Sequence, residues 1–340
     1  MESKGFIFDV EDKEKYVISK IKNEDIKHIN LSNDILYHKS FLEKASNNTT
    51  CYIMKEQIGK GGASVVYKGN IKDTDEVVVI KELKTVNLYK VKREVNILNI
   101  CKNIPNVIHL HDFFIHDNSY YLLFPYYNCQ TSRTIFYNFT LIEIKIFMRK
   151  FLEALEKLHE IGVIHRDLKP GNILVKSCSE FYIIDFGISD FYMPYRKFDM
   201  KLGTRNFKSP EQLVCIKGFD YGIDIWACGL IFAEMYFSHY PFWKPEEDII
   251  ILENIYKMVG HARFTNFLKE FNIETEYNFL STNIEPMNFD KYFERKPNDS
   301  IRCNTEENKK AFDLIEKMLE INPKNRITAS EALKHPFLSN

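Results

Sequence analysis

The stretch His165-Arg166-Asp167-Leu168-Lys169-Pro170-Gly171-Asn172 decides the fold of this chain. Asp185-Phe186-Gly187 follows it, and Ser209-Pro210-Glu211 comes next after 21 intervening residues. An isolated Asp-Phe-Gly is common, but the ordered series of three motifs at these spacings is specific. The series therefore indicates both a fold and a chemistry.

The residue types in these motifs suit phosphoryl transfer. A carboxylate, here Asp167, can orient an incoming hydroxyl group and take its proton. Asn172 and Asp185 offer oxygen ligands of the kind that Mg²⁺ prefers. Lys169 and the upstream Lys81 offer positive charge against phosphate groups. We therefore expect Asp167, Lys169 and Lys81 to be catalytic residues, and Asn172 and Asp185 to bind the metal ion.

A glycine-rich turn lies upstream, between two segments with a strand pattern. Glycine lets backbone N–H groups approach phosphate oxygens without an intervening side chain. The same residues could instead form a simple tight hairpin. The turn and its flanks comprise Ile58, Gly59, Lys60, Gly61, Gly62, Ala63, Ser64, Val65 and Val66.

Lys81 ends a run of β-branched residues, which favour a buried strand. A buried ammonium without a partner is costly. Glu94, thirteen residues further on, lies in the only helix expected in this part of the chain and is the candidate partner. The alternative is a solvated lysine at the end of a strand.

Composition excludes several classes of protein. The 340 residues carry 46 Lys plus Arg against 47 Asp plus Glu, so a basic coat for nucleic acid is absent and direct nucleic-acid binding is not expected. Seven dispersed cysteines favour free thiols, mostly buried, over disulfides. The apolar stretch 223–237 contains two carboxylates and is too short to span a bilayer, so we expect a buried helix and no membrane partner. No signal peptide is visible, which indicates an intracellular soluble protein.

The pattern of elements indicates an α+β fold in which a sheet-rich part precedes a helical part. Residues 1–51 form an extension without a motif, and residues 261–309 have the irregular composition of an insert. Strands are expected at 52–58, 65–68, 77–81, 108–113, 120–124, 173–175 and 181–184. Helices are expected at 90–100, 147–161, 223–237, 310–320 and 329–335. Thr328 and Glu331 should form a capping box at the last helix.

Taken together, these motifs resemble the eukaryotic protein kinases over about residues 52–340. The resemblance implies a bilobal fold with a small antiparallel-sheet N-lobe (52–124), a hinge (125–128) and a mainly helical C-lobe (129–340). It implies ATP and Mg²⁺ as cofactors, and Lys169 favours serine/threonine over tyrosine substrates. ATP would contact the glycine-rich turn, although Ser64 replaces its third glycine, together with Lys81, Glu94, Phe124, Tyr126 and Tyr127.

The resemblance also assigns two structural roles. Glu211 should pair with Arg326 and brace the helical lobe. Asp224 should hold the backbone of the catalytic loop. A pseudokinase scaffold is the alternative from another class, but none of Lys81, Asp167, Asn172 and Asp185 is lost. A kinase of small molecules would not need Ser209-Pro210-Glu211 together with Asp224.

Two narrower families are similar to this chain. Residues 125–127, 133–137 and 203–211 resemble the cell-division-control-seven kinases, which act in DNA replication with a regulatory subunit. Residues 92–98 and 190–192, and Phe207-Lys208 followed by Pro210-Glu211, resemble the catalytic subunit of casein kinase II, although that family has Asp-Trp-Gly where this chain has Asp-Phe-Gly. The first resemblance implies a regulatory protein subunit, a role in the cell cycle and cell division, and the nucleus.

Both families act on acidic protein sites, and two cations of this chain match basic positions in them. Arg205 and Lys208 are therefore expected to bind an acidic or phosphorylated residue that follows the phosphoacceptor. Bracing of the loop by Arg205 is the alternative. Between Gly187 and Ser209 the hydroxyl residues are Ser189, Tyr192, Tyr195 and Thr204. None of them is suited to act as a phosphoserine or phosphothreonine switch, so activity should not need such a phosphate.

Overall fold

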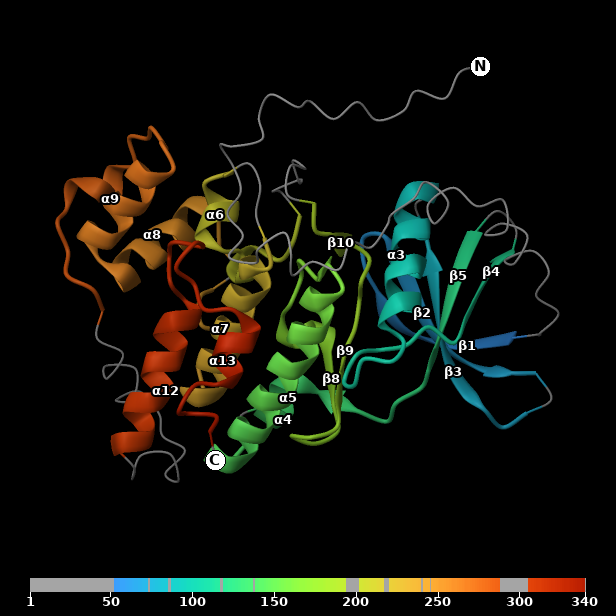
Figure 1. Cartoon of the computed structure of the whole chain (residues 1–340). Coiled ribbons are helices and arrows are strands. Elements are labelled where there is room, and N and C mark those ends of the chain that lie inside the picture. The colour runs from blue at the N-terminus through green and yellow to red at the C-terminus, as the bar shows by residue number, and fades with distance from the viewer. Residues whose placement is uncertain are drawn as a thin grey trace, which may run out of the picture.

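The computed structural model describes residues 52–72, 74–84, 87–116, 119–136, 138–193, 202–216, 220–239, 241–244, 246–287 and 305–339. The expected N-terminal extension, Tyr137, Tyr195 and the end of the expected insert (288–304) lie outside these residues. The described chain forms a lobe built on a β-sheet and a mainly helical lobe (Figure 1). This arrangement confirms the expected α+β bilobal fold.

The sheet of the first lobe has five antiparallel strands in the order β1-β2-β3-β5-β4. Alternation along β3 places Val78 and Ile80 on one face, where they pack with Tyr121 and Leu123. The other face carries Leu83, which belongs to the main core together with residues of helix α3. The bounds are β1 Tyr52–Lys60, β2 Ser64–Ile71, β3 Val77–Leu83, α3 Leu88–Cys101, β4 Asp112–His116 and β5 Ser119–Pro125.

Helix α7 (Gly222–Tyr236) lies at the centre of the helical lobe, and all its residues from Ile223 onward are buried. Helix α5 (Leu141–Glu160) packs beside it and begins with a capping box between Thr140 and Glu143. The last helix has the expected capping box between Thr328 and Glu331. The other bounds are α4 Ser132–Phe136, α6 Pro210–Leu213, α8 Asp248–Val259, α9 His261–Glu270, α12 Thr305–Met318 and α13 Ala329–Leu333.

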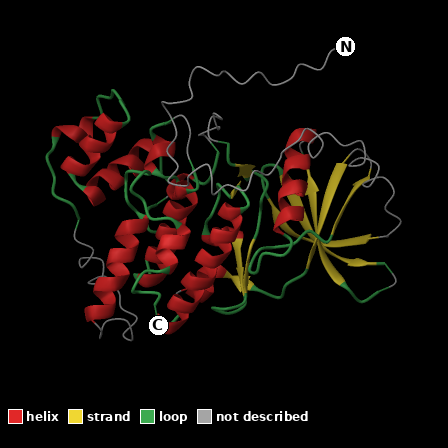
Figure 2. Ribbon diagram, in the orientation of Figure 1, coloured by secondary structure: helices red, strands yellow, loops and turns green. Residues whose placement is uncertain are grey.

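Short strands position the motif loops between the two lobes (Figure 2). The catalytic loop that contains Asp167 runs from β7 (Val163–Ile164) to β8 (Ile173–Val175). The Asp185-Phe186-Gly187 loop runs from β9 (Phe181–Ile183) to β10 (Asp190–Phe191). β10 pairs with β7, and β8 pairs with both β9 and β6 (Gln130–Thr131). This pairing fixes the two loops beside each other.

Several sequence expectations are corrected by the structure. The strand expected at 108–113 lies at Asp112–His116, because Ile108 bonds through its backbone to Ile183 and enters the core instead. The segment expected as an insert at 261–309 is more regular than expected, because it begins with helix α9, whose Phe264, Phe267 and Leu268 are buried. The helix expected at 310–320 begins earlier, at Thr305.

The membrane and cysteine expectations can be checked for the described residues. No described helix has both the length and the apolar character that a membrane span requires. The five described cysteines are free thiols, as expected. Burial was overestimated, since only Cys101 and Cys228 are buried and Cys215 is exposed. Cys51 and Cys303 lie outside the described residues.

Candidate active site

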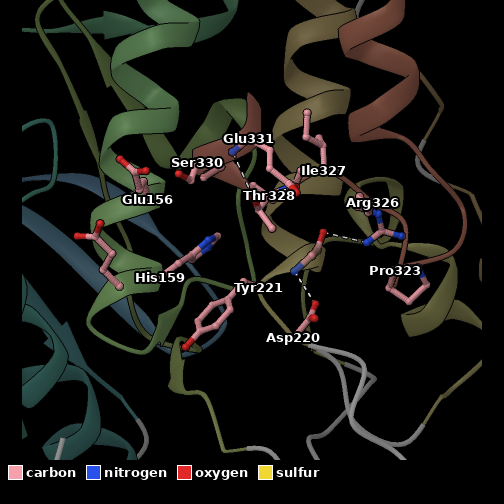
Figure 3. A pocket seen from close by; sticks show the side chains of 14 residues that line it. Glu156, His159, Asp220, Tyr221, Pro323, Arg326, Ile327, Thr328, Ser330 and Glu331 are labelled. Atoms are coloured by element: carbon pink, nitrogen blue, oxygen red, sulfur yellow. Dashed lines mark hydrogen bonds between the residues drawn. The ribbon is translucent and has the colours of Figure 1, made fainter. Parts of the chain in front are cut away.

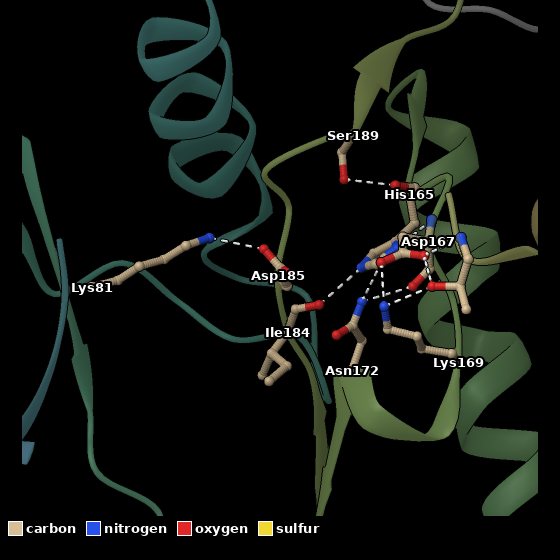
Figure 4. Close-up of polar contacts among 9 residues, drawn as sticks. Lys81, His165, Asp167, Lys169, Asn172, Ile184, Asp185 and Ser189 are labelled. Carbon is tan, nitrogen blue, oxygen red and sulfur yellow. Dashed lines mark hydrogen bonds and ion pairs between the residues drawn. The ribbon is translucent and has the colours of Figure 1, made fainter. Parts of the chain in front are cut away.

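Two carboxylates from other parts of the chain, those of Glu94 and Asp185, contact the Lys81 ammonium. Odd-numbered residues of β3 face helix α3, so Lys81 extends toward that helix. Its Nζ lies 2.7 Å from Glu94 Oε1 and 2.8 Å from Asp185 Oδ1; Figure 4 shows the contact with Asp185. A Cβ on Gly187 would lie 3.3 to 3.6 Å from atoms of all three residues. Gly187 therefore lies directly beside the three charges, and a side chain there would be slightly tight against Asp185 alone.

The charges of this group stabilise one another. Burial opposes the charged form of Lys81, but Glu94 and Asp185 outweigh it and raise the pKa of the ammonium above its ordinary value. The surrounding protein also opposes ionisation of Asp185, and attraction to Lys81 outweighs this and lowers the pKa of the carboxyl group. Lys81 is thus a cation and Asp185 an anion at neutral pH. Half of the Asp185 side chain is exposed, which leaves it accessible to a metal ion.

The Asp167 carboxylate is held by donors on both of its oxygens (Figure 4). Oδ1 accepts from the backbone N and the Oγ1 of Thr204 at 2.9 and 2.6 Å. Oδ2 accepts from Lys169 Nζ at 2.8 Å and from Asn172 Nδ2 at 3.0 Å. Lys169 Nζ also lies 2.7 Å from Thr204 Oγ1, which closes a triangle. This network fixes the position at which a base could meet a hydroxyl group.

The backbone of the catalytic loop is strained and is clamped by Asp224. Arg166 has a φ of 72°, a conformation that costs a residue other than glycine about 1–3 kcal/mol. The buried Asp224 carboxylate accepts from the backbone N of His165 and of Arg166 at 2.8 and 2.9 Å, and charge-assisted bonds can offset that cost. Gly203 has a φ of 101°, and a Cβ at this position would lie only 3.0 Å from the Arg166 carbonyl oxygen, so both the backbone conformation and the space favour glycine. The expected role of Asp224 is confirmed.

The glycine-rich turn leaves open space around its backbone. Gly61 N donates to Ser64 O at 2.9 Å, which closes the turn between β1 and β2. A Cβ on Gly62 would meet no described atom within 4 Å, and Gly62 does not have a positive φ. Neither packing nor backbone conformation within the described chain therefore explains the glycine. The expected contact of this turn with ATP stays a prediction, and the open space around Gly62 leaves room for it.

The expected hinge follows directly from the sheet. Phe124 and Pro125 are the last residues of β5 and pair with Val79 and Val78 of β3. Tyr127 stacks on Tyr182 of β9, with ring centroids 3.7 Å apart. The hinge is thus tied to both lobes, as a nucleotide site between them would require.

The metal and nucleotide expectations agree with these donors. Asn172 donates through Nδ2 to Asp167, so its amide oxygen remains for a cation, and Asp185 offers a half-exposed carboxylate. The described residues contain no cluster of three or more His, Cys, Asp or Glu side chains that could hold a metal. A two-residue protein site is what Mg²⁺ uses when phosphate oxygens and water complete its shell. Asn172 and Asp185 therefore suit Mg²⁺ bound with ATP.

Comparison with known proteins decides the family. The protein kinase domain family matches residues 52–338. The chain belongs to this family. A probable serine/threonine-protein kinase of Dictyostelium discoideum is 32% identical over 295 residues, which cover 85% of this chain and 48% of that protein. The chain thus spans about half the length of this relative. Membership of the family implies ATP and a divalent metal ion, usually Mg²⁺.

The expected brace of the kinase C-lobe is present. Arg326 forms a two-pronged ion pair with Glu211 at 2.6 and 2.9 Å, and both side chains are fully buried. Arg326 also donates to the backbone carbonyls of Glu320 and Gly222. The structure thereby confirms the pair expected from the kinase resemblance.

The two expected substrate-binding cations lie close together but differ in exposure. Lys208 is buried, and its Nζ lies 3.2 Å from Asp248 Oδ2 at the start of helix α8. Arg205 keeps 64% of its side chain exposed and lies 3.9 Å from the same carboxylate. The sequence analysis missed Asp248 because it is distant in the sequence and belongs to no motif. Two further contacts were missed: the hydrogen bonds from Thr204 to Asp167, and the ion pair between Asp190 and Arg93.

A cavity of about 370 Å³ lies elsewhere in the kinase C-lobe (Figure 3). It is bounded by the end of α5, the start of α7 and the segment before α13. None of the expected site residues lines it. One wall is the buried Asp220, whose pKa is raised to about 6 by burial.

Proposed function

We propose that this protein kinase is an active serine/threonine kinase that prefers an acidic residue directly after the phosphoacceptor. The observation that carries the activity is the network at Asp167, whose carboxylate is held by Thr204, Lys169 and Asn172. The name of the Dictyostelium relative supports serine/threonine specificity.

Each residue of the site has a role in the proposed transfer. ATP bound with Mg²⁺ supplies the γ-phosphoryl group. Asp167 orients the substrate hydroxyl and accepts its proton as the new O–P bond forms and the bond to ADP breaks. Lys169 lies beside Asp167, where it can stabilise negative charge on the transferred group. Lys81 positions the phosphates, and Glu94 holds Lys81 in place.

We assign the acidic preference mainly to Arg205. Its exposed guanidinium can reach a carboxylate or a phosphate of the substrate, whereas the Lys208 charge is largely satisfied by Asp248. Exposed ion pairs contribute only about 0.2–1 kcal/mol, and Asp248 competes for both cations. We therefore expect an acidic residue at the following position to raise kcat/KM by at most about fivefold.

Peptides that differ only in the residue after the serine test this preference. Aspartate should be favoured over alanine, Arg205→Ala should remove most of the gain, and Asp248→Asn should increase it. Arg263→Ala is the matched control, since Arg263 is a half-exposed arginine paired with Glu320 on another part of the lobe. Equal kcat/KM values for the aspartate and alanine peptides, or selection for proline, would contradict the preference.

The biological role of the kinase is a further part of this proposal. Residues 125–127 and 203–211 resemble the replication kinases, so we propose a cell-cycle and DNA-replication role in the nucleus with a regulatory subunit. A kinase similar to casein kinase II is the alternative, supported by residues 92–98 and 190–192. Purification of the tagged full chain from its own cells separates the two, because the replication role predicts that the kinase loses activity when its copurifying subunit is removed.

A further inference from the structure

Asp190 joins three elements of the kinase through one buried carboxylate. It lies in β10, five residues after Asp185, and is 2% exposed. Its Oδ2 lies 2.7 Å from Nη1 of Arg93 in helix α3 and 3.6 Å from Nη1 of Arg166 in the catalytic loop. Its Oδ1 accepts from the backbone N of Phe191 at 2.9 Å. Both arginines are buried as well.

The free energy of this buried group favours the arrangement in which Asp190 stays paired with Arg93 and Arg166. A buried ion is costly without partners, and removal of one member leaves the others uncompensated. Arg93 directly precedes Glu94 in α3, so an outward displacement of this part of the helix that withdrew Glu94 from Lys81 would also move Arg93 away from Asp190. Asp190 therefore opposes the displacement of α3 and links the helix to the catalytic loop at the same time.

We propose that Asp190 is a positioning residue. In kinases that are switched on by phosphorylation, a phosphate on the activation loop, the segment between Gly187 and Ser209, supplies a negative charge. In this chain the Asp190 carboxylate supplies that charge. A phosphate would order such a loop by pairing with arginines. Here a carboxylate already pairs with Arg93 and Arg166. The Lys81–Glu94 pair consequently forms without loop phosphorylation. This inference rests on the proposed kinase activity.

The serine and threonine hydroxyl groups described between Gly187 and Ser209 support a fixed arrangement. Ser189 is fully buried and donates to the His165 carbonyl at 3.0 Å. Thr204 is bound to Asp167 and Lys169. Both hydroxyls already have structural roles, and a phosphate on either would break them. Among the described residues between Gly187 and Ser209, Asp190 carries the negative charge that pairs with Arg93 and Arg166.

Asp190→Asn is the central test, because it keeps the size of the side chain and removes its charge. We expect kcat/KM to fall by at least about tenfold, and amide hydrogen exchange in residues 88–101 to become faster. Asp190→Glu should restore part of both properties. Glu180→Gln, which removes a carboxylate from an exposed pair with Lys176, is the control and should change neither. Phosphatase treatment of the wild-type enzyme should leave its activity unchanged.

Arg93→Gln keeps the proposal testable if Asp190→Asn fails to fold, since it removes the same contact from the side of α3 and should also speed exchange there. Wild-type exchange in residues 88–101 of folded Asp190→Asn or Arg93→Gln would overturn the proposal. So would loss of wild-type activity that tracks a mapped serine or threonine phosphate in the loop. The exchange experiment needs no activity, so an inactive wild-type enzyme would defeat the proposed function alone.

Discussion

At the scale of single residues, two of the six non-glycine residues that have a positive φ in the described part of this kinase lie in its catalytic motifs. Arg166 and Asp185 have φ values of 72° and 66°, in the region that favours glycine. Asp224 clamps the first of them, and the ion pair with Lys81 holds the second. The strain is thus offset by charged contacts, and each functional side chain is fixed in direction as well as position.

A second residue-scale feature gives a pH dependence to stability. Burial raises the pKa of Asp220 to about 6, although the Gly222 N–H opposes the shift. An unfolded aspartate has a pKa of about 3.9. The folded state therefore favours the protonated form, and the favourable contribution of Asp220 is present below pH 4 and is lost as the pH rises through 6.

Asp220→Asn should remove this dependence, because asparagine does not ionise and still accepts from Gly222 N. Relative to the wild-type protein, we expect the variant to gain on the order of 2 kcal/mol in free energy of unfolding between pH 4.5 and 7.5. Urea denaturation at the two pH values measures this change. The exposed Asp75→Asn serves as the control. A stability difference from the wild type that is the same at both pH values would refute the assignment.

At the scale of elements, one buried ion pair connects helix α6 to the segment before α13. The Glu211–Arg326 pair is fully buried and has two bonds, and the Arg326 guanidinium also lies over the Trp226 ring, 5.1 Å from its centroid. A buried ion pair is not always more stabilising than apolar side chains of the same size in its place. Removal of one partner alone, however, destabilises the protein because the other charge stays buried without compensation.

Arg326→Ala should lower the free energy of unfolding by about 3–5 kcal/mol. Lys324→Ala is the control in the same segment, since its pair with Glu270 is largely exposed and should be worth less than about 1 kcal/mol. Chemical denaturation of the two variants provides the comparison. If both variants lost a similar free energy of unfolding, the contribution of the Glu211–Arg326 pair to stability would not depend on its burial.

The elements also show what the sequence could and could not predict. Residues joined by a motif were found, including the pairs Lys81–Glu94 and Glu211–Arg326 and the clamp at Asp224. Helix α9 was missed, because polar residues surround its short apolar face and the composition resembled an insert. Asp248 and Asp190 were missed as ion-pair partners, because their contacts depend on the packing of distant elements and leave no periodic pattern.

At the scale of the whole molecule, the two lobes contribute different halves of the site. The sheet lobe supplies Lys81, Glu94 and the glycine-rich turn, whereas the helical lobe supplies Asp167, Asn172 and Asp185. Contacts such as Lys81–Asp185 and Arg93–Asp190 cross between the lobes. Loss of the Arg93–Asp190 contact should therefore reduce activity without removal of any group assigned to ATP, the metal ion or the substrate.

The most direct test of the account is transfer of labelled γ-phosphate from ATP to a serine peptide that carries aspartate after the serine, with and without Mg²⁺. The full chain, tagged and purified from its own cells together with any subunit that accompanies it, should transfer phosphate only when the metal is present. Asp167→Asn should reduce turnover at least about a hundredfold while the protein remains folded, because it removes the group that orients the hydroxyl and accepts its proton. Transfer by Asp167→Asn at the wild-type rate, or no transfer by the wild-type chain to any serine or threonine peptide, would contradict the account.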